Sequence, residues 1–206
     1  RPYAVLGHPV EHTLSPAMHN AAFATLGRDA VYLAFDVLPE HLLNVLGAMG
    51  SMGFAGVNLT VPLKEVAYRG LTDLDESARQ AGAVNTIRFT EGGMCGHNTD
   101  GYGLLRALEE AFGTKINGEH LVMLGSGGAA RAAALTCARE GAASVTVVAR
   151  NRERAETLKE ELQRVALSKI PFHLKTNTLL LNISRVIGGI KRIRIYSRAL
   201  MFLYFR

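Results

Sequence analysis

The sequence predicts an α/β protein with largely parallel sheets, divided into two domains. Three observations support this fold class. Short runs rich in β-branched residues alternate with segments whose apolar residues recur at helical spacing. A glycine-rich turn follows one of these runs, at residues 125–130. The 206 residues are 48% hydrophobic, which is enough to form one large core or two small ones.

The expected strands are six short runs separated by helical patterns. They lie at residues 3–7, 31–37, 56–61, 83–89, 121–125 and 144–149. The segment at residues 39–49 shows the intervening pattern, with apolar residues at helical spacing. Because strands that alternate with helices usually run in the same direction, this order favours parallel sheets.

A helix that begins at Gly101 is expected to connect the two domains. Its apolar residues fall on one face: Leu104, Leu105, Leu108 and Phe112. Gly113 marks its end. We therefore expect a first domain at residues 1–100, a linker helix at residues 101–117 and part of a second domain at residues 118–166.

Residues 121–164 predict the order strand, glycine turn, helix, strand and helix, which is the first half of a Rossmann-like dinucleotide-binding domain. The composition then changes at about Ala166. Residues 1–166 carry 15 basic and 18 acidic residues, whereas residues 167–206 carry 8 basic and no acidic ones. A frameshift, a read-through or an insertion junction would explain this atypical tail, so we expect a truncated domain. The run at residues 178–184 is a candidate for one more strand, and without later strands a flank of the sheet would be exposed.

Charge and cysteine content exclude several classes of function. Residues 1–166 have a net charge of −3 (15 − 18), so a nucleic-acid or membrane-surface role would depend on the tail alone, and we expect neither partner. Cys95 and Cys137 have no metal-ligand or disulfide spacing, which favours a reduced, cytoplasmic protein without a metal. No run reaches the roughly 18 apolar residues of a membrane helix. The chain begins like a fragment, without an initiator Met or a signal peptide.

Ser15 and Pro16 mark the start of a helix. One interpretation is local, because Ser is a favourable N-cap and Pro a favourable first residue. The other is functional, because a helix N-terminus with free N–H groups and the hydroxyls of Thr13 and Ser15 could hold a carboxylate. The two interpretations are compatible.

Lys64 and Asp100 also have two interpretations. Lys64 follows a strand and a proline, where most lysines are solvated, and Asp100 could cap the helix that begins at Gly101. A strand end, however, faces the crevice in which open α/β sheets bind ligands, and partial burial lowers the pKa of a lysine toward values useful in acid–base catalysis. If the two side chains meet, the carboxylate orients the amine.

The turn at residues 125–130 is a variant of the glycine fingerprint of dinucleotide-binding domains. Its N–H groups and the following helix could hold a pyrophosphate, and its residues are Gly125, Ser126, Gly127, Gly128 and Ala129. About 25 residues later, an NAD site usually has an acidic residue for the ribose. This chain has Arg150, Asn151 and Arg154 there instead, and guanidinium groups suit a 2′-phosphate. We therefore expect NADP rather than NAD.

Four segments of the chain are similar to motifs of one known family. They are residues 7–20, 56–64, 98–101 and 125–130. On these motifs, residues 1–166 resemble the shikimate dehydrogenase family, and the last 40 residues do not. The resemblance implies an N-terminal α/β substrate domain followed by a Rossmann-like cofactor domain.

The same resemblance implies roles for individual residues. Lys64 and Asp100 would form the catalytic pair, in which the amine takes a hydroxyl proton from the substrate. Thr13 and Ser15 would bind the carboxylate of shikimate. Hydrogen bonds to the ring hydroxyls would come from Thr60 and Asn85, with Asn58 as a weaker candidate.

The activity implied by the resemblance is the reversible, NADPH-dependent reduction of 3-dehydroshikimate to shikimate in aromatic amino-acid (chorismate) biosynthesis. Two alternatives stay open: a quinate/shikimate dehydrogenase that uses NAD, and a truncated, catalytically impaired protein that only binds the substrate. We expect a small-molecule substrate as the partner, and a homodimer is compatible with the sequence.

Overall fold

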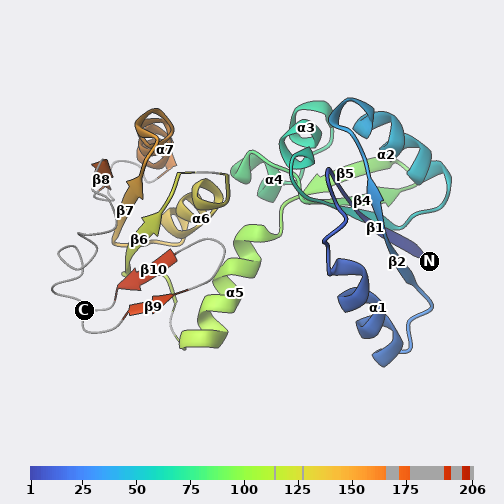
Figure 1. The fold of residues 1–206 in the computed structure, drawn as a ribbon, viewed down its shortest axis with the longest axis horizontal. Helices are drawn as coiled ribbons and strands as arrows, with labels where there is room; N and C mark the ends of the chain where they lie inside the picture. The colour runs from blue at the N-terminus through green and yellow to red at the C-terminus, as the bar shows by residue number, and fades with distance from the viewer. Residues whose placement is uncertain (114, 127, 166–171, 177–192, 196–200, 205–206) are drawn as a thin grey trace. The chain divides into compact units, whose positions relative to one another are not determined.

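The computed structural model describes residues 1–113, 115–126, 128–165, 172–176, 193–195 and 201–204. The chain forms two compact units, Arg1–Thr99 and Asp100–Arg206, and each has its own sheet and hydrophobic core (Figure 1). Among the described residues, no helix combines the length and the apolar composition that crossing a membrane requires.

The first unit contains a five-stranded sheet in the order β2-β1-β3-β4-β5. Its strands are β1 (Pro2–Gly7), β2 (Val31–Asp36), β3 (Gly56–Leu59), β4 (Thr86–Thr90) and β5 (Gly93–His97). Strand β1 is parallel to β2 and β3, whereas β4 is antiparallel to β3 and to β5. The expectation of largely parallel sheets is therefore only partly correct, and the sheet is mixed.

Strand β5 is not among the strands predicted from the sequence. A two-residue connection, Glu91-Gly92, joins it to β4, and the register pairs Thr90 with Gly93. Gly93 has a φ of 126°, which residues with a side chain rarely adopt. The strand itself contains two glycines and no β-branched residue, so its intrinsic strand propensity is weak. Pairing with β4 determines its structure.

Helices cover both faces of this sheet. They are α1 (Ser15–Thr25), α2 (Leu42–Ser51), α3 (Leu63–Gly70) and α4 (Glu76–Ala81), with a short 3-10 helix, η1 (Pro39–His41). Alternate residues of a strand point to opposite faces. Ala4 and Leu6 of β1 belong to the larger core, which includes residues of α2 and α3. Val5 lies in a smaller core with Phe23 of α1 packed against it, so α1 covers the opposite face.

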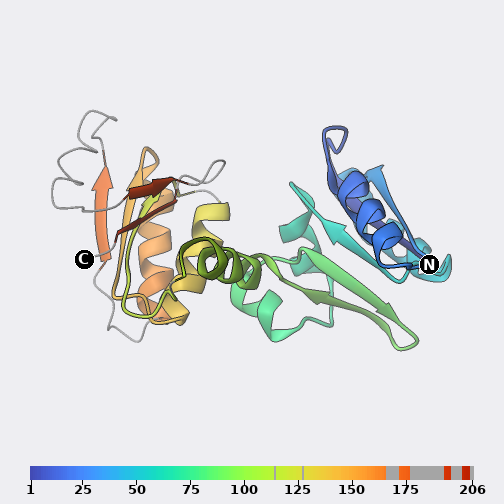
Figure 2. The same cartoon turned by 90° about the horizontal axis from the view of Figure 1, so that it is seen from below.

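The second unit has the Rossmann-like order predicted for its first half. It contains α5 (Asp100–Phe112), β6 (His120–Leu124), α6 (Gly128–Arg139), β7 (Ser144–Ala149) and α7 (Arg152–Val165), followed by three short strands, β8 (Phe172–Thr176), β9 (Ile193–Ile195) and β10 (Met201–Tyr204). Strands β6, β7 and β8 are parallel. Helices α6 and α7 lie side by side against these strands (Figure 2).

The described residues of the tail extend this sheet on both sides. The sheet order is β8-β7-β6-β10-β9, and β10 pairs antiparallel with β6, with Met201 opposite Met123. The expectation that one flank of the sheet is exposed is therefore wrong, because β10 pairs with the free side of β6. The run at residues 178–184, a candidate strand, lies outside the described residues. Strand β8, at residues 172–176, precedes it.

Candidate functional site

The predicted substrate residues of the first unit lie at one edge of its sheet. Strands β1 and β3 are parallel, so the segments that follow Gly7 and Leu59 begin at the same edge. Strand β4 runs the opposite way and starts at this edge, because Thr86 pairs with Asn58. Strand β5 ends there, because Thr86 also pairs with His97.

Hydrogen bonds to Asp36 hold the loop that follows β1. The His8 Nδ1 lies 2.6 Å from Asp36 Oδ1, and the Val10 N–H donates to Asp36 Oδ2 at 3.2 Å. The hydrogen bond from the His8 side chain is the main reason that the pKa of Asp36 lies below its usual range. Because Asp36 ends β2, these contacts fix the course of the chain toward α1.

Thr13 and Ser15 lie together at the start of α1, but Ser15 is not the N-cap. The helix begins at Ser15, and Leu14 occupies the cap position without a side-chain hydrogen bond. The Thr13 hydroxyl donates to Ser15 Oγ at 3.1 Å and accepts from the Ser15 N–H at 3.3 Å. The capping prediction is therefore wrong, because Thr13 provides the acceptor. The structure still brings the two hydroxyls together beside a helix N-terminus.

Thr60 and Lys64 follow β3 at the same edge. The Thr60 N–H donates to Leu6 O at 2.9 Å, and Thr60 O accepts from the Leu63 N–H at 2.8 Å, which sets the turn into α3. Lys64 lies in the first turn of α3, and the residue is half-buried. Its carbonyl accepts from the Val84 N–H at 3.0 Å. The backbone of Lys64 is thus tied to the segment that leads to Asn85.

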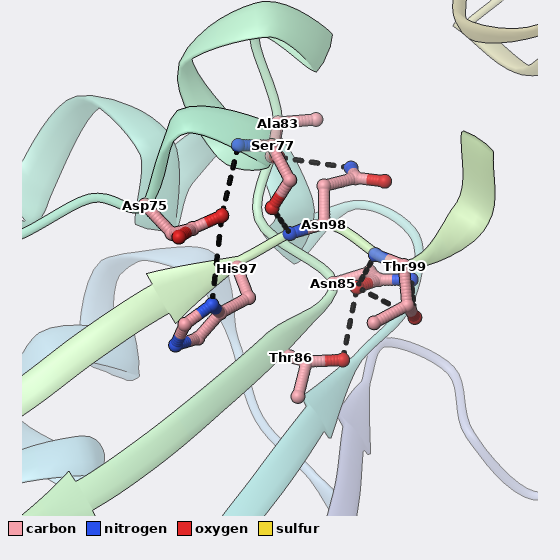
Figure 3. Close-up of polar contacts among 8 residues, drawn as sticks. All are labelled: Asp75, Ser77, Ala83, Asn85, Thr86, His97, Asn98 and Thr99. Atoms are coloured by element: carbon pink, nitrogen blue, oxygen red, sulfur yellow. Dashed lines mark hydrogen bonds and ion pairs between the residues drawn. The ribbon is translucent and has the colours of Figure 1, made fainter. Parts of the chain in front are cut away.

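Asn85 connects the start of β4 to the end of the first unit. It is only 7% exposed. Its Oδ1 accepts from the Thr99 N–H and from the Thr86 hydroxyl, both at 2.9 Å, and its Nδ2 donates to the Thr99 hydroxyl at 3.0 Å. Figure 3 shows these three residues converging. The Asn85 amide therefore fixes Thr99, the last residue of the unit.

A second set of hydrogen bonds supports the same segment. The Asn98 N–H donates to Ser77 Oγ at 3.0 Å, and Asn98 Nδ2 donates to Ala83 O at 2.9 Å (Figure 3). Asp75 Oδ1 accepts from the Ser77 N–H at 2.9 Å and thereby caps α4. No sequence motif indicates a function for Asp75 or Ser77. The chain entering Thr99 is consequently held from both sides.

Asn58 takes part in an internal network. Its Oδ1 accepts from the Tyr32 hydroxyl at 2.6 Å, and its Nδ2 donates to the Thr86 hydroxyl at 3.0 Å and to Asn85 O at 3.3 Å. Tyr32 was missed by sequence reasoning, because it comes from a different strand and from no recognised motif. Burial raises the pKa of Tyr32 to about 12.

Asp100 and Gly101 begin α5 in the second unit. Asp100 is exposed and lies in the first turn of the helix. A Cβ on Gly101 would lie 2.5 Å from Thr136 Oγ1 of α6, so glycine is required for the close approach of these two helices. Lys64 belongs to the first unit and Asp100 to the second, and their pairing stays a prediction.

The glycine turn lies between β6 and α6. Gly125 has a φ of 108°, and its N–H donates to Val148 O at 2.8 Å. The turn therefore starts beside the carboxyl end of β7. Ser126 follows, and α6 begins at Gly128 and includes Ala129, whereas Gly127 lies outside the described residues. A left-handed glycine followed by a helix N-terminus fits the binding of a pyrophosphate.

The residues after β7 fit an additional phosphate. Asn151 Oδ1 accepts from the Arg154 N–H at 2.9 Å and caps α7. Arg150 and Arg154 are exposed, and neither guanidinium has an acidic partner within the described part of the chain. Arg131, in contrast, pairs with Glu161 at 2.6 Å. The donor set at this edge is therefore cationic and available to an anion.

These features define a class of two-domain α/β proteins, with a polar site on the first domain and a Rossmann-like glycine turn on the second. A model of the shikimate dehydrogenase substrate binding domain matches residues 5–87, and a model described as shikimate / quinate 5-dehydrogenase matches residues 106–187. The chain belongs to the shikimate dehydrogenase family. The second match extends past residue 166, so the similarity continues beyond the change in composition.

Curated relatives agree with this assignment. The chain is 49% identical over 160 residues to the NADP(+) shikimate dehydrogenase of Symbiobacterium thermophilum, covering 78% of this chain and 54% of the relative. It is 50% identical over 159 residues to that of Methanopyrus kandleri, covering 77% and 55%. The chain thus spans about half the length of the curated relatives it matches.

Solved structures are similar in fold. Shikimate 5-dehydrogenase of Thermus thermophilus, in complex with NADP(H) and shikimate, has a TM-score of 0.72 at 39% identity, over 86% of this chain and 68% of that one. The ligand-free 5-ketofructose reductase of a Gluconobacter species has a TM-score of 0.78 at 33% identity, over 86% and 62%. The family fold therefore occurs with more than one substrate.

Proposed function

We propose that this chain catalyses the NADP-dependent, reversible reduction of 3-dehydroshikimate to shikimate. The observation that carries the proposal is the convergence of the family's substrate residues at one edge of the first sheet. The curated relatives named as NADP(+) shikimate dehydrogenases support it further. In functional terms, we propose a substrate domain at residues 1–100, a linker helix at residues 101–117, a cofactor domain that begins at residue 118 and runs to residue 166, and a basic tail at residues 167–206.

On the substrate side, the Thr13 and Ser15 hydroxyls would donate hydrogen bonds to the carboxylate of shikimate. The positive end of the α1 dipole favours an anion at this place. Thr60 and Asn85 would bind the ring hydroxyls. A polyol that leaves water needs such partners, because each unpaired hydroxyl costs free energy.

Lys64 would carry the proton. In the oxidation of shikimate, its Nζ accepts the proton of the reacting hydroxyl, and in the reverse direction it returns that proton to the oxygen. The carboxylate of Asp100 would orient the amine. NADP, when bound, supplies or accepts the hydride that the substrate carbon exchanges.

The cofactor would be held by the second unit. The turn from Gly125 to Ala129 would bind the pyrophosphate through the N–H groups that follow Gly125, those of Ser126, Gly127, Gly128 and Ala129. The guanidinium groups of Arg150 and Arg154 would bind the 2′-phosphate, and the Asn151 amide could donate a further hydrogen bond. This donor set favours NADP over NAD.

Two other activities make useful comparisons. A quinate/shikimate dehydrogenase with NAD is disfavoured by the arginines that follow β7. Reduction of the ketone of another polyol is a second candidate activity, because one structural relative is named a 5-ketofructose reductase. The impaired binding protein is not favoured, since the relatives are named as enzymes and the dehydrogenase model matches through residue 187. A homodimer and a cytoplasmic location stay predictions.

The test is a comparison of turnover on a matrix of substrates and cofactors. Shikimate, quinate and the reduced form of 5-ketofructose are each oxidised with NADP and with NAD, and kcat/KM is measured. We expect the highest value for shikimate with NADP. A higher value for another substrate, or for NAD, would reject this proposal, and so would a lack of turnover with every pair in a folded chain.

A further inference from the structure

Side chains of α1 hold Tyr32 in place, although Tyr32 belongs to no motif of the candidate site. The residue is 4% exposed. The Asn20 carboxamide contacts both of its backbone groups: Nδ2 donates to Tyr32 O at 2.9 Å, and Oδ1 accepts from the Tyr32 N–H at 2.8 Å. The His19 ring stacks on the Tyr32 ring, with 4.3 Å between centroids and 16° between planes. These contacts determine where the phenol hydroxyl lies.

The Tyr32 hydroxyl starts a directed chain of hydrogen bonds. It donates to Asn58 Oδ1 at 2.6 Å, so the Asn58 Nδ2 faces the other way and donates to the Thr86 hydroxyl at 3.0 Å. Because Thr86 Oγ1 accepts that bond, its own proton is directed to Asn85 Oδ1, at 2.9 Å. Donors and acceptors alternate at every step, so the bond from Tyr32 favours the same orientation of the two amides as the backbone bonds from Asn58 Nδ2 to Asn85 O and from the Thr99 N–H to Asn85 Oδ1.

We infer that Tyr32 is a positioning residue for the candidate substrate site. Its hydroxyl orients the amides of Asn58 and Asn85, and through Asn85 it holds Thr99, the residue before Asp100. The inference rests on the proposed function, because it takes Asn85 and Asp100 as residues that act on the substrate. It also explains how α1, which begins with the carboxylate-binding hydroxyls, is coupled to the residues that bind the ring.

The hydroxyl can keep this role across the pH range of an assay. Burial raises the pKa of Tyr32 to about 12, so the phenol retains the proton that it donates to Asn58. A phenylalanine at this position would keep the stacked ring and remove only the donor. The Asn58 oxygen would then lose its partner in a partly buried environment.

The chain offers a matched control in Tyr3. Tyr3 of β1 lies opposite Tyr32 of β2 and packs against the same small core. The centroids of the Tyr3 and Phe23 rings are 5.6 Å apart. Its hydroxyl has no hydrogen-bond partner among the described residues. For Tyr32→Phe we expect kcat for shikimate oxidation to fall about tenfold and the KM for shikimate to rise, with the KM for NADP unchanged. Tyr3→Phe should leave all three values unchanged.

A purely structural role would lower the melting temperature of Tyr32→Phe without changing kcat or the KM for shikimate, and this outcome would overturn the inference. Nitrogen-15 NMR gives a readout that needs no turnover. We expect the side-chain amide signals of Asn58 and Asn85 and the backbone amide of Thr99 to shift in Tyr32→Phe and not in Tyr3→Phe. Unchanged signals would also overturn it.

Titration of shikimate into the same samples separates this inference from the proposed function. A wild-type chain that does not bind shikimate would contradict the proposed function and, with it, the role of Tyr32. A wild-type chain that binds shikimate, together with a Tyr32→Phe variant that binds it equally well and turns it over equally fast, would contradict the inference alone.

Discussion

At the scale of single residues, Asp75 shows how a polar side chain supports the site from outside it. Its carboxylate caps α4, and hydrogen bonds from the Ser77 side chain and N–H lower its pKa below the usual aspartate value. Ser77 in turn accepts from the Asn98 N–H. Protonation of Asp75 would weaken the cap and the hydrogen bonds that hold the chain before Thr99.

We expect Asp75→Ala to lower the free energy of unfolding at neutral pH, because a helix loses its N-cap. The folded pKa of Asp75 is lowered, so its contribution is complete above the unfolded pKa of about 4 and is lost as the pH falls through the folded value. Urea unfolding between neutral and acid pH measures both effects. Glu91→Ala, a substitution at an exposed carboxylate, serves as the control. If the free energy of unfolding depended on acid pH equally in Asp75→Ala and in the wild type, this explanation would be contradicted.

The residues of the site were more predictable than their partners. Lys64, Thr60 and Asn85 lie in local motifs at strand ends, which a single sequence displays. Tyr32 and Thr99 form hydrogen bonds with residues 26 and 14 positions away in the chain, and such pairing depends on the sheet order. The cap of α1 was assigned to Ser15 on residue preference alone, but Thr13 provides the acceptor instead.

At the scale of elements, the approach of α5 to α6 explains why glycine follows Asp100. A Cβ at Gly101 would meet Thr136 Oγ1 at 2.5 Å, whereas no described atom lies within 4 Å of a Cβ at Gly103. Both glycines lie in the first turns of the same helix. They therefore form a matched pair in which only the packing differs.

We expect Gly103→Ala to stabilise the chain by about 0.5–1 kcal/mol, because alanine favours the helix. Gly101→Ala gains the same propensity but crowds α6, so we expect it to be less stable than Gly103→Ala by about 1–3 kcal/mol. Chemical denaturation compares the two. A second substitution, Thr136→Ala, added to Gly101→Ala should remove most of this difference, because it removes the atoms that the new Cβ would meet. Equal stabilities for the two glycine variants would rule out close helix packing.

Elements with a strong pattern were predicted well. The runs that became β1, β6 and β7 are rich in apolar and β-branched residues, and α5 carries its apolar residues on one face, with Leu108 buried. Strand β5 was missed, because its glycines give a weak local signal and its pairing with β4 decides its structure. The antiparallel strand β10 was equally difficult to predict, because its residues pair with residues about 80 positions earlier in the chain.

At the scale of the whole molecule, the two units have separate cores. One includes Leu6, Leu46 and Ile87, and the other includes Leu121, Val145 and Leu158. A ligand that binds one unit stabilises that unit by mass action. The proposed division of labour therefore predicts which part of the chain each ligand should protect.

We expect calorimetry to resolve two unfolding transitions. Shikimate should raise the temperature of one transition, and NADP should raise the temperature of the other. At a ligand concentration of 100 times Kd, the stabilisation should be about 2.7 kcal/mol. Ile87→Val in the first core and Val145→Ala in the second identify which transition belongs to which unit. Each substitution should lower the transition temperature of only the unit that contains it. If shikimate and NADP both raised the same transition alone, the proposed division would be wrong.

Turnover of Lys64→Ala measures whether this amine moves the proton. We expect the wild type to oxidise shikimate with NADP, and we expect Lys64→Ala to lose at least about 100-fold in kcat while it still binds both ligands, because only the proton acceptor is removed. Lys115→Ala, an exposed lysine of the second unit, should retain wild-type turnover. A Lys64→Ala variant with wild-type kcat would show that another group moves the proton and would contradict the proposed role of Lys64.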